Sequence, residues 1–285
     1  MKHSISWILF SLVLYSCAAH KTTVPLWKTL PEPPAMPVAD ETGLAPVNDI
    51  KMYYAVFNKN GDRPVILLHG GFVSSDYWSF EVPLLAKTHK VIVVDSRGHG
   101  RSTLSHQPFS YELMTSDVLR LMDYLKIDRA SIIGWSDGGI IGMLFAIHHP
   151  DRIDRLFTYG SNYNRSGNNT GPRDSTGTAR FMSQVQENYR RISPTPEGFS
   201  NLRSALAKMY AVEPDLKPED LKKIQAPTVI ACGQYEQFTK REHFAEIAQL
   251  IPNAKLVVIP NVSHGGPIQD PAKFHKAVIN FLDRK

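Results

Sequence analysis

The segment Gly134-Trp135-Ser136-Asp137-Gly138 most constrains what this chain can fold into. It follows a short β-branched run, 130–133, and precedes an apolar stretch, 140–149, that can form a helix. Gly-x-Ser-x-Gly between a strand and a helix is typical of a sharp, strained turn that pushes the serine side chain outward. Ser136 is therefore a candidate nucleophile. The alternative interpretation is an ordinary turn between a strand and a helix.

Strand and helix patterns alternate from Met52 onward. The candidate strands are short and rich in Val and Ile, as expected for buried parallel strands, and they are Met52–Phe57, Val65–Leu68, Val91–Val94, Ala130–Ile133, Leu156–Tyr159, Thr228–Cys232 and Leu256–Ile259. Segments of helical period lie between them, one with Ser110 as a plausible N-cap. The pattern predicts an α/β fold, a mostly parallel central sheet with helices on both faces. Ligands bind such sheets at the carboxyl ends of the strands.

One interval breaks this alternation. No strand pattern appears between residues 161 and 225, where a polar stretch is followed by weak helices around 182–192 and 205–211. An insertion of this length is more typical of a lid than of a second domain. We therefore expect a core formed by residues 49–160 and 226–285, with residues 161–225 inserted as a lid.

Three residue types that serve hydrolysis occur where predicted strands end. In chain order they are Ser136, Glu236 and His264. A serine hydroxyl needs an imidazole to take its proton, and the imidazole needs a carboxylate to orient it. Glu236, three residues after Gly233 at a strand end, is the candidate acid, although a loop glutamate is usually just solvated.

An oxyanion hole would complete such a site. The backbone amide of Asp137 is one candidate donor because it opens the helix after Ser136. The second donor is expected from the glycine-rich turn after Val65–Leu68, as the amide of Gly71 or Phe72.

The first residues have the pattern of an export signal. A basic start at Lys2-His3 precedes an apolar run, 5–15, that ends at Ser16-Cys17-Ala18. We expect residues 1–17 to be a lipoprotein-type signal with Cys17 lipidated, which would anchor the mature protein to a membrane of the bacterial cell envelope. The alternative is cleavage near Ala18 or Ala19, which gives a periplasmic or secreted product. The proline-rich residues 18–48 are expected to form an extended tether.

Composition argues against several other classes of protein. The net charge is only +5 and the basic residues are scattered, so no nucleic-acid partner is expected. No Cys/His group has zinc-site spacing and no glycine-rich loop has phosphate-binding spacing, so neither a metal nor a cofactor is expected. Cys232 is predicted to be a buried strand residue. Nothing in the sequence indicates an oligomeric state.

Taken together, these motifs resemble the α/β-hydrolase superfamily over roughly Ile50 to Lys285. The carriers are His69-Gly70-Gly71, the Asp95-to-Ser102 motif, the Ser136 turn, Gly233-x-x-Glu236 and Ser263-His264. The family normally has Asp where this chain has Glu236.

The segment Gly134 to Gly139 is also similar to that of the valacyclovir hydrolase (biphenyl hydrolase-like) family, in which the acid after the serine is associated with amino-acid esters. The resemblance implies that Trp135 and Asp137 bind substrate, with Asp137 recognising an ammonium group. The alternative is that Asp137 simply begins a helix and favours its dipole.

The sequence therefore predicts a serine hydrolase that cleaves a carboxylic ester of a small molecule. Two alternatives remain: a C–C bond hydrolase or perhydrolase that uses the same three residues, and a catalytically silent binding module at the cell surface.

Overall fold

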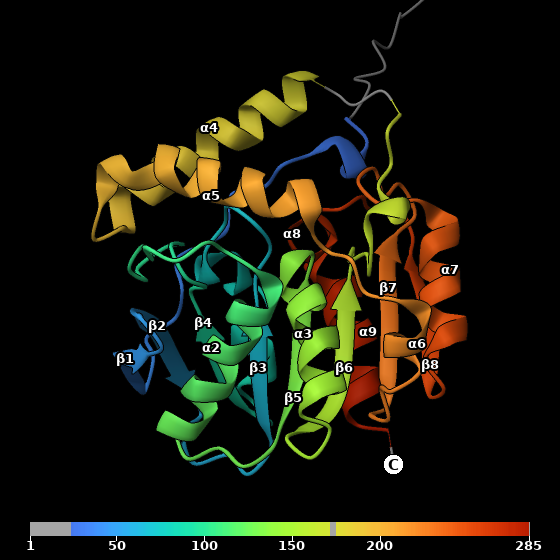
Figure 1. The fold of residues 1–285 in the computed structure, drawn as a ribbon, viewed down its shortest axis with the longest axis horizontal. Coiled ribbons are helices and arrows are strands. Elements are labelled where there is room, and N and C mark those ends of the chain that lie inside the picture. Colours follow the sequence, from blue (N-terminus) through green and yellow to red (C-terminus); the bar gives the residue numbers. More distant parts are fainter. Residues whose placement is uncertain (1–23, 172–174, 285) are drawn as a thin grey trace, which may run out of the picture.

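An eight-stranded sheet lies at the centre of the computed structural model, which describes residues 24–171 and 175–284 (Figure 1). In chain order the strands are β1 (Glu41–Val47), β2 (Ile50–Phe57), β3 (Pro64–Leu68), β4 (Lys90–Val94), β5 (Ala130–Trp135), β6 (Ile153–Tyr159), β7 (Thr228–Gly233) and β8 (Ala254–Ile259). Their order across the sheet is β1-β2-β4-β3-β5-β6-β7-β8. Strands β1 and β2 are antiparallel to their neighbours, whereas β3 to β8 run parallel. The predicted α/β fold with a mostly parallel sheet is confirmed.

Burial explains why the central strands read as continuous apolar runs. Every residue of β5 and of β7 is buried, including Cys232, because helices cover both faces of the sheet. Strand β8 differs from the expectation of full cover. It is the edge strand, and its Leu256 and Val258 are 40% and 39% exposed.

The expected tether at residues 18–48 needs a correction. Residues 41–47 form strand β1, which pairs with β2 from Glu41↔Val56 to Val47↔Ile50. Proline hides this strand in the sequence, but Pro46 is tolerated because β1 lies at the sheet edge. Residues 24–40 include a 3₁₀ helix, Leu26–Lys28, and Leu30, Met36 and Ala39 pack against the core. The predicted signal, with Cys17, lies outside the described residues.

Helices cover the two faces of the sheet as the alternation predicts (Figure 1). Helices α2 (Tyr111–Tyr124) and α3 (Asp137–His148) pack together on one face, and α9 (Pro271–Leu282) lies on the other. Ser110 caps α2 as expected, since its hydroxyl accepts from the backbone N–H of Leu113 at 3.1 Å. Helices α1 (Val82–Leu85), α7 (Arg241–Leu250) and α8 (Gly266–Gln269) also belong to the core, whereas α6 (Pro218–Leu221) lies near the end of the insertion.

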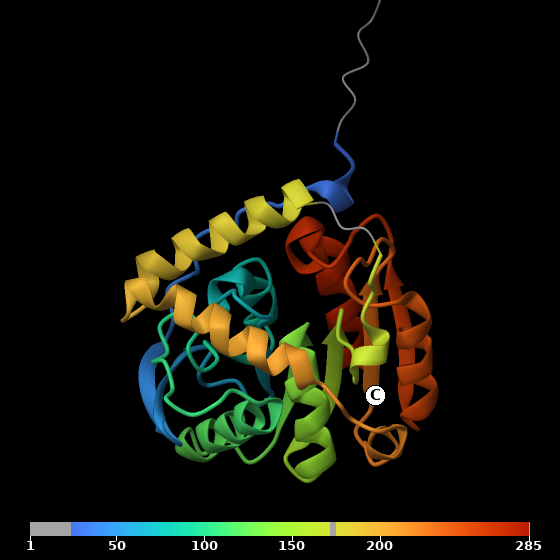
Figure 2. The same ribbon diagram turned by 45° about the horizontal axis from the view of Figure 1, so that its top comes forward.

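Two helices of the insertion cross the carboxyl ends of the strands. Helices α4 (Ser175–Ile192) and α5 (Phe199–Val212) lie above the arrowheads of the parallel strands (Figures 1 and 2). Helix α5 contacts the core partly through aromatic side chains. The ring centroid of Phe72 lies 6.4 Å from that of Phe199 and 6.3 Å from that of Tyr210, both on α5. The insertion therefore lies over the edge at which ligands bind such sheets.

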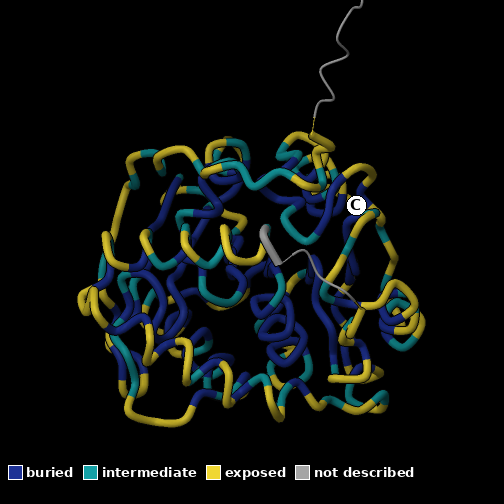
Figure 3. The backbone as a smooth tube through the Cα atoms, turned by 90° about the horizontal axis from the view of Figure 1, so that it is seen from above, coloured by how far each residue is buried: buried dark blue, intermediate teal, exposed yellow. Residues whose placement is uncertain are grey.

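The motif after β4 holds the fold together. Arg97 binds both oxygens of Asp117 on α2 at 2.7 and 2.8 Å, and both side chains are buried. Asp95 accepts from the backbone N–H groups of Ser75 and Arg101, each at 2.7 Å. These hydrogen bonds are charge-assisted because a carboxylate accepts each of them. They lie in the interior of the protein, where most of the backbone is buried, whereas the exposed residues lie around the outside (Figure 3). The motif joins β4 to the segments on either side of it.

Within residues 24–171 and 175–284, no helix combines the length and the apolar composition needed to cross a membrane.

The pairing of β1 gives a test that a flexible tether would not pass. Ala45 is 0% exposed and Leu44, its neighbour, is 51% exposed. We expect Ala45→Asp to lower the free energy of unfolding by about 3 kcal/mol because it buries an unpaired charge, whereas Leu44→Asp should change it by less than about 0.5 kcal/mol. Urea denaturation followed by tryptophan fluorescence measures both. Similar small changes in the two variants would show that β1 is not part of the cooperative fold.

Candidate active site

Ser136 occupies the strained turn that the sequence predicts between β5 and α3. Its φ and ψ are 54° and −117°, a conformation that non-glycine residues rarely adopt. Its backbone N–H donates to the carbonyl of Tyr159 at 2.8 Å, and its own carbonyl accepts from the Ser161 hydroxyl at 2.7 Å. A Cβ at Gly134 would clash with the carbonyl of Gly138, and a Cβ at Gly138 would clash with the carbonyl of Leu68, so each position needs glycine for its own reason.

His264 and Glu236 meet in the structure. The Nδ1 of His264 lies 2.9 and 3.0 Å from the two carboxylate oxygens of Glu236. Glu236 is held in turn by the backbone N–H of Phe238, which donates to Oε1 at 2.9 Å. Both side chains are largely buried, at 14% exposed for His264 and 4% for Glu236. Glu236 thus contacts the histidine from the place in the sequence where the family normally has Asp.

Gly160 shows how close this pair lies to the serine turn. It directly follows Tyr159, whose carbonyl accepts from Ser136. A Cβ at Gly160 would lie 2.8 Å from Nδ1 of His264 and 3.2 Å from Oε2 of Glu236. The three residues predicted from the sequence therefore gather at the carboxyl ends of β5, β7 and β8, around Gly160 at the end of β6.

The predicted oxyanion donors flank Ser136. The amide of Asp137 is the first of α3 and so has no acceptor within that helix. The turn after β3 approaches from the other side, since a Cβ at Gly70 would lie 3.1 Å from Cβ of Ser136. Gly71 and Phe72 follow, and Phe72 has a φ of 68°, in the left-handed region.

His69 fixes this turn, a role that our sequence analysis missed. Its Nδ1–H donates to the carbonyl of Gly70 at 2.7 Å, and its Nε2 accepts from the backbone N–H of Ser96 at 2.9 Å. Burial lowers the pKa of His69 to about 4, so the neutral imidazole that both bonds require persists near neutral pH. The available signal was a histidine between a buried strand and two glycines.

The carboxylate of Asp137 is occupied by two tyrosines, which the sequence also did not predict. Tyr111 donates to Oδ1 at 2.8 Å and Tyr210 donates to Oδ2 at 2.5 Å. Burial raises the pKa of both tyrosines, so they remain hydroxyl donors. Burial also raises the pKa of Asp137, an effect that the two hydrogen bonds oppose. Because Tyr210 lies on α5, this carboxylate joins the serine turn to the insertion.

Trp135, which we expected to bind substrate, has its side chain inside the protein. Its side chain is 4% exposed, and its indole N–H donates to the carbonyl of His264 at 2.9 Å. Its ring packs near Tyr77 and Trp78. Through this hydrogen bond Trp135 supports the loop of His264 from inside the core.

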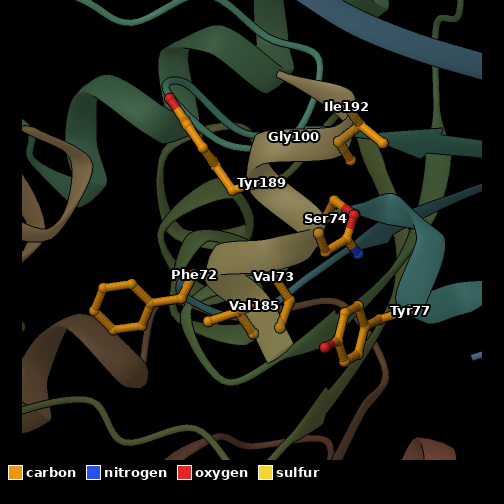
Figure 4. Close-up of a pocket in the computed structure, with 9 residues that line it drawn as sticks. Phe72, Val73, Ser74, Tyr77, Gly100, Val185, Tyr189 and Ile192 are labelled. Carbon is orange, nitrogen blue, oxygen red and sulfur yellow. The ribbon is translucent and has the colours of Figure 1, made fainter. Parts of the chain in front are cut away.

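Phe72 also lines a small cavity beneath α4. Side chains from α4 and from the segment after β3 come together there, as Figure 4 shows for Val185, Phe72, Val73 and Tyr77. The volume of the cavity is about 10 Å³, roughly the room that one water molecule needs. It is too small for an ester substrate in this arrangement of α4.

Sequence comparison agrees with the sheet topology and the serine turn. The family model for the alpha/beta hydrolase fold matches residues 63–200. The chain belongs to the α/β-hydrolase superfamily.

Curated relatives of this hydrolase act on different compounds. It is 26% identical over 275 residues to the sn-1-specific diacylglycerol lipase ABHD11 of Danio rerio, covering 86% of each chain. It is 25% identical over 274 residues to 3-oxoadipate enol-lactonase 2 of Acinetobacter baylyi, covering 87% of this chain and 99% of that one. Relatives named as hydrolases and esterases support the conclusion that this chain is an enzyme.

A solved structure shows the same architecture. The enol-lactonase from Burkholderia xenovorans superposes on this hydrolase with a TM-score of 0.69 at 25% identity, covering 85% of this chain and 100% of that chain. The two chains therefore share the α/β-hydrolase fold.

Asp137 has two interpretations, recognition of an ammonium group on the substrate and a structural role at the start of α3. Its hydrogen bonds to two tyrosines favour the structural role. We expect Asp137→Ala to lower the free energy of unfolding by about 1–3 kcal/mol, because two buried hydroxyls lose their acceptor. The ratio of kcat/KM for an amino ester to that for its N-acetyl counterpart should not change. Urea denaturation and paired ester kinetics measure the two effects. A loss of amino-ester preference in the variant would instead assign ammonium recognition to Asp137.

Proposed function

We propose that this hydrolase cleaves a carboxylic ester through an acyl-enzyme, with Ser136 as nucleophile, His264 as base and Glu236 as orienting acid. The observation that carries the proposal is the contact of Nδ1 of His264 with both oxygens of Glu236, at 2.9 and 3.0 Å. This contact commits the Nδ1 proton to the carboxylate and leaves Nε2 as the nitrogen that can accept a proton. The names of the diacylglycerol lipase and the enol-lactonase support an ester or lactone bond as the target.

The reaction follows from these positions. Ser136 Oγ attacks the ester carbonyl while its proton passes to Nε2 of His264. The negative charge on the former carbonyl oxygen is stabilised by the amides of Asp137 and of Gly71 or Phe72. The alcohol leaves with the proton from His264, and a water molecule, deprotonated by the same nitrogen, releases the acid and restores Ser136.

We further propose that α4 and α5 form the predicted lid of residues 161–225. Support comes from their place over the strand ends and from the hydrogen bond that Tyr210 on α5 donates to Asp137, next to Ser136. Substrate entry would then require displacement of these helices, which is how lids commonly gate hydrolases.

The triad makes a direct prediction. Ser136→Ala and His264→Ala should each abolish ester hydrolysis without loss of the folded state, and their effects should be similar because the residues act as a unit. Glu236→Gln should lower kcat by about 10²–10⁴-fold, because the amide cannot stabilise the imidazolium. The measurement is kcat on an ester chosen by screening a panel with the purified chain.

Glu242, exposed in the first turn of α7, is the matched control. Glu242→Gln should leave kcat unchanged, and equal small effects at both glutamates would place the acid elsewhere. Labelling of the wild-type chain, but not of Ser136→Ala, by a fluorophosphonate probe separates an enzyme from a silent binding module. Labelling without turnover of any ester would favour C–C bond hydrolysis or perhydrolysis.

We also propose that the protein is exported and lipidated at Cys17, on the basis of the sequence of residues 1–17 alone. Mass spectrometry of the mature N-terminus should detect a diacylated peptide that begins at Cys17. An unmodified peptide that begins near His20 would overturn lipidation and leave export intact, whereas an intact Met1 would overturn both.

A further inference from the structure

The segment before β1 contacts the loops that carry two of the three proposed catalytic residues. The indole ring of Trp27 stacks on Tyr235, with ring centroids 4.8 Å apart and planes 22° from parallel. Tyr235 immediately precedes Glu236. The carbonyls of Trp27 and Thr29 accept from the side-chain amide of Gln269 at 3.2 and 2.9 Å. This segment lies outside residues 63–200, the part matched by the family model.

Gln269 links the same segment to the histidine loop. It lies at the end of α8 and is 7% exposed. Its Oε1 accepts from the backbone N–H of Ser263 at 2.7 Å, and Ser263 immediately precedes His264. One side chain thus binds the N-terminal segment through its amide nitrogen and the histidine loop through its oxygen.

The two catalytic loops are also joined to each other. The backbone N–H of Tyr235 donates to the carbonyl of Val262 at 2.9 Å. The side chain of Gln237 accepts from the backbone N–H of His264 at 3.2 Å. Trp27 and Gln269 therefore contact two loops that are already hydrogen-bonded to each other. Trp27 contacts the Glu236 loop and Gln269 contacts the His264 loop.

A glutamate in the acid position needs its loop to be held more firmly than an aspartate would. Glutamate has one more rotatable bond than aspartate and loses more rotamer freedom when it is fixed. Its two short contacts with His264 therefore depend strongly on where the backbone of Tyr235–Gln237 is held. A misplacement of about 1 Å at a catalytic group can cost roughly 10²-fold in rate.

We propose that Trp27 and Gln269 are positioning residues: the segment Trp27–Thr29 holds the Glu236 and His264 loops at the separation that their hydrogen bonds require. This inference rests on the proposed function, since it assigns Trp27 an effect that acts only through the Glu236–His264 pair.

A double-mutant cycle tests it in the full chain. Trp27→Ala should lower kcat between about 10- and 100-fold with KM unchanged, and Trp27→Phe, which keeps a stacking ring, should restore most of the loss. In a Glu236→Gln background, Trp27→Ala should lower kcat less than twofold, because the contact that it supports is already lost. Val38→Ala, at a side chain that is 97% exposed in the same N-terminal stretch, is the matched control and should change nothing.

The outcomes separate this inference from the proposed function. An equal fold loss in both backgrounds, or no loss in the wild-type background, overturns the positioning role. A fall in melting temperature that accounts for the loss, with Trp27→Phe no better than Trp27→Ala, also overturns it. If Glu236→Gln by itself leaves kcat unchanged, the proposed acid is wrong and the positioning role falls with it.

Discussion

The close approach of backbone at the serine turn is the constraint on which the rest of the site depends. Gly138 fits against the carbonyl of Leu68 at the end of β3, and Gly134 fits against Gly138 itself. Only this spacing lets α3 begin directly over β3 and β5, which places Ser136 and the first amide of the helix at the sheet edge. The strained φ of Ser136 is stabilised by bonds to Tyr159, the last residue of the neighbouring strand β6, and to Ser161 just after it. The turn is thus supported by the sheet rather than by its own residues.

The sequence predicted the parts of this fold that are set by local patterns. Buried parallel strands read as apolar runs, and the turns after β5, β7 and β8 carry residue types that few other structures need together. Ser136, Glu236 and His264 could therefore be located, although only the structure shows that Glu236 reaches His264. The sequence did not reveal strand β1. A proline and alternating exposure are typical of an edge strand, but a stretch with Pro46 and several exposed residues also resembles a tether.

What the sequence could not predict were the long-range partners of polar side chains. Tyr111 and Tyr210 lie 26 and 73 residues from Asp137, and neither position carries a motif. Their hydroxyls occupy both oxygens of a carboxylate that looks, in sequence, available for a ligand. The burial of Trp135 was unpredictable for a related reason, because neighbours of a nucleophile in the chain need not share its exposure. Such pairings depend on the packing of α2 and α5 over α3, which no single stretch of residues determines.

The two ends of the described chain lie at opposite ends of the molecule. Trp27 sits beside the carboxyl ends of β7 and β8, whereas the last helix, α9, ends at the far side (Figure 1). Immobilising the protein by its N-terminus would thus turn the strand ends toward the support and restrict access to large or particulate substrates. Attachment through the C-terminus would leave that edge facing the solution. The same chain fixed by either end should then behave as two different surface catalysts.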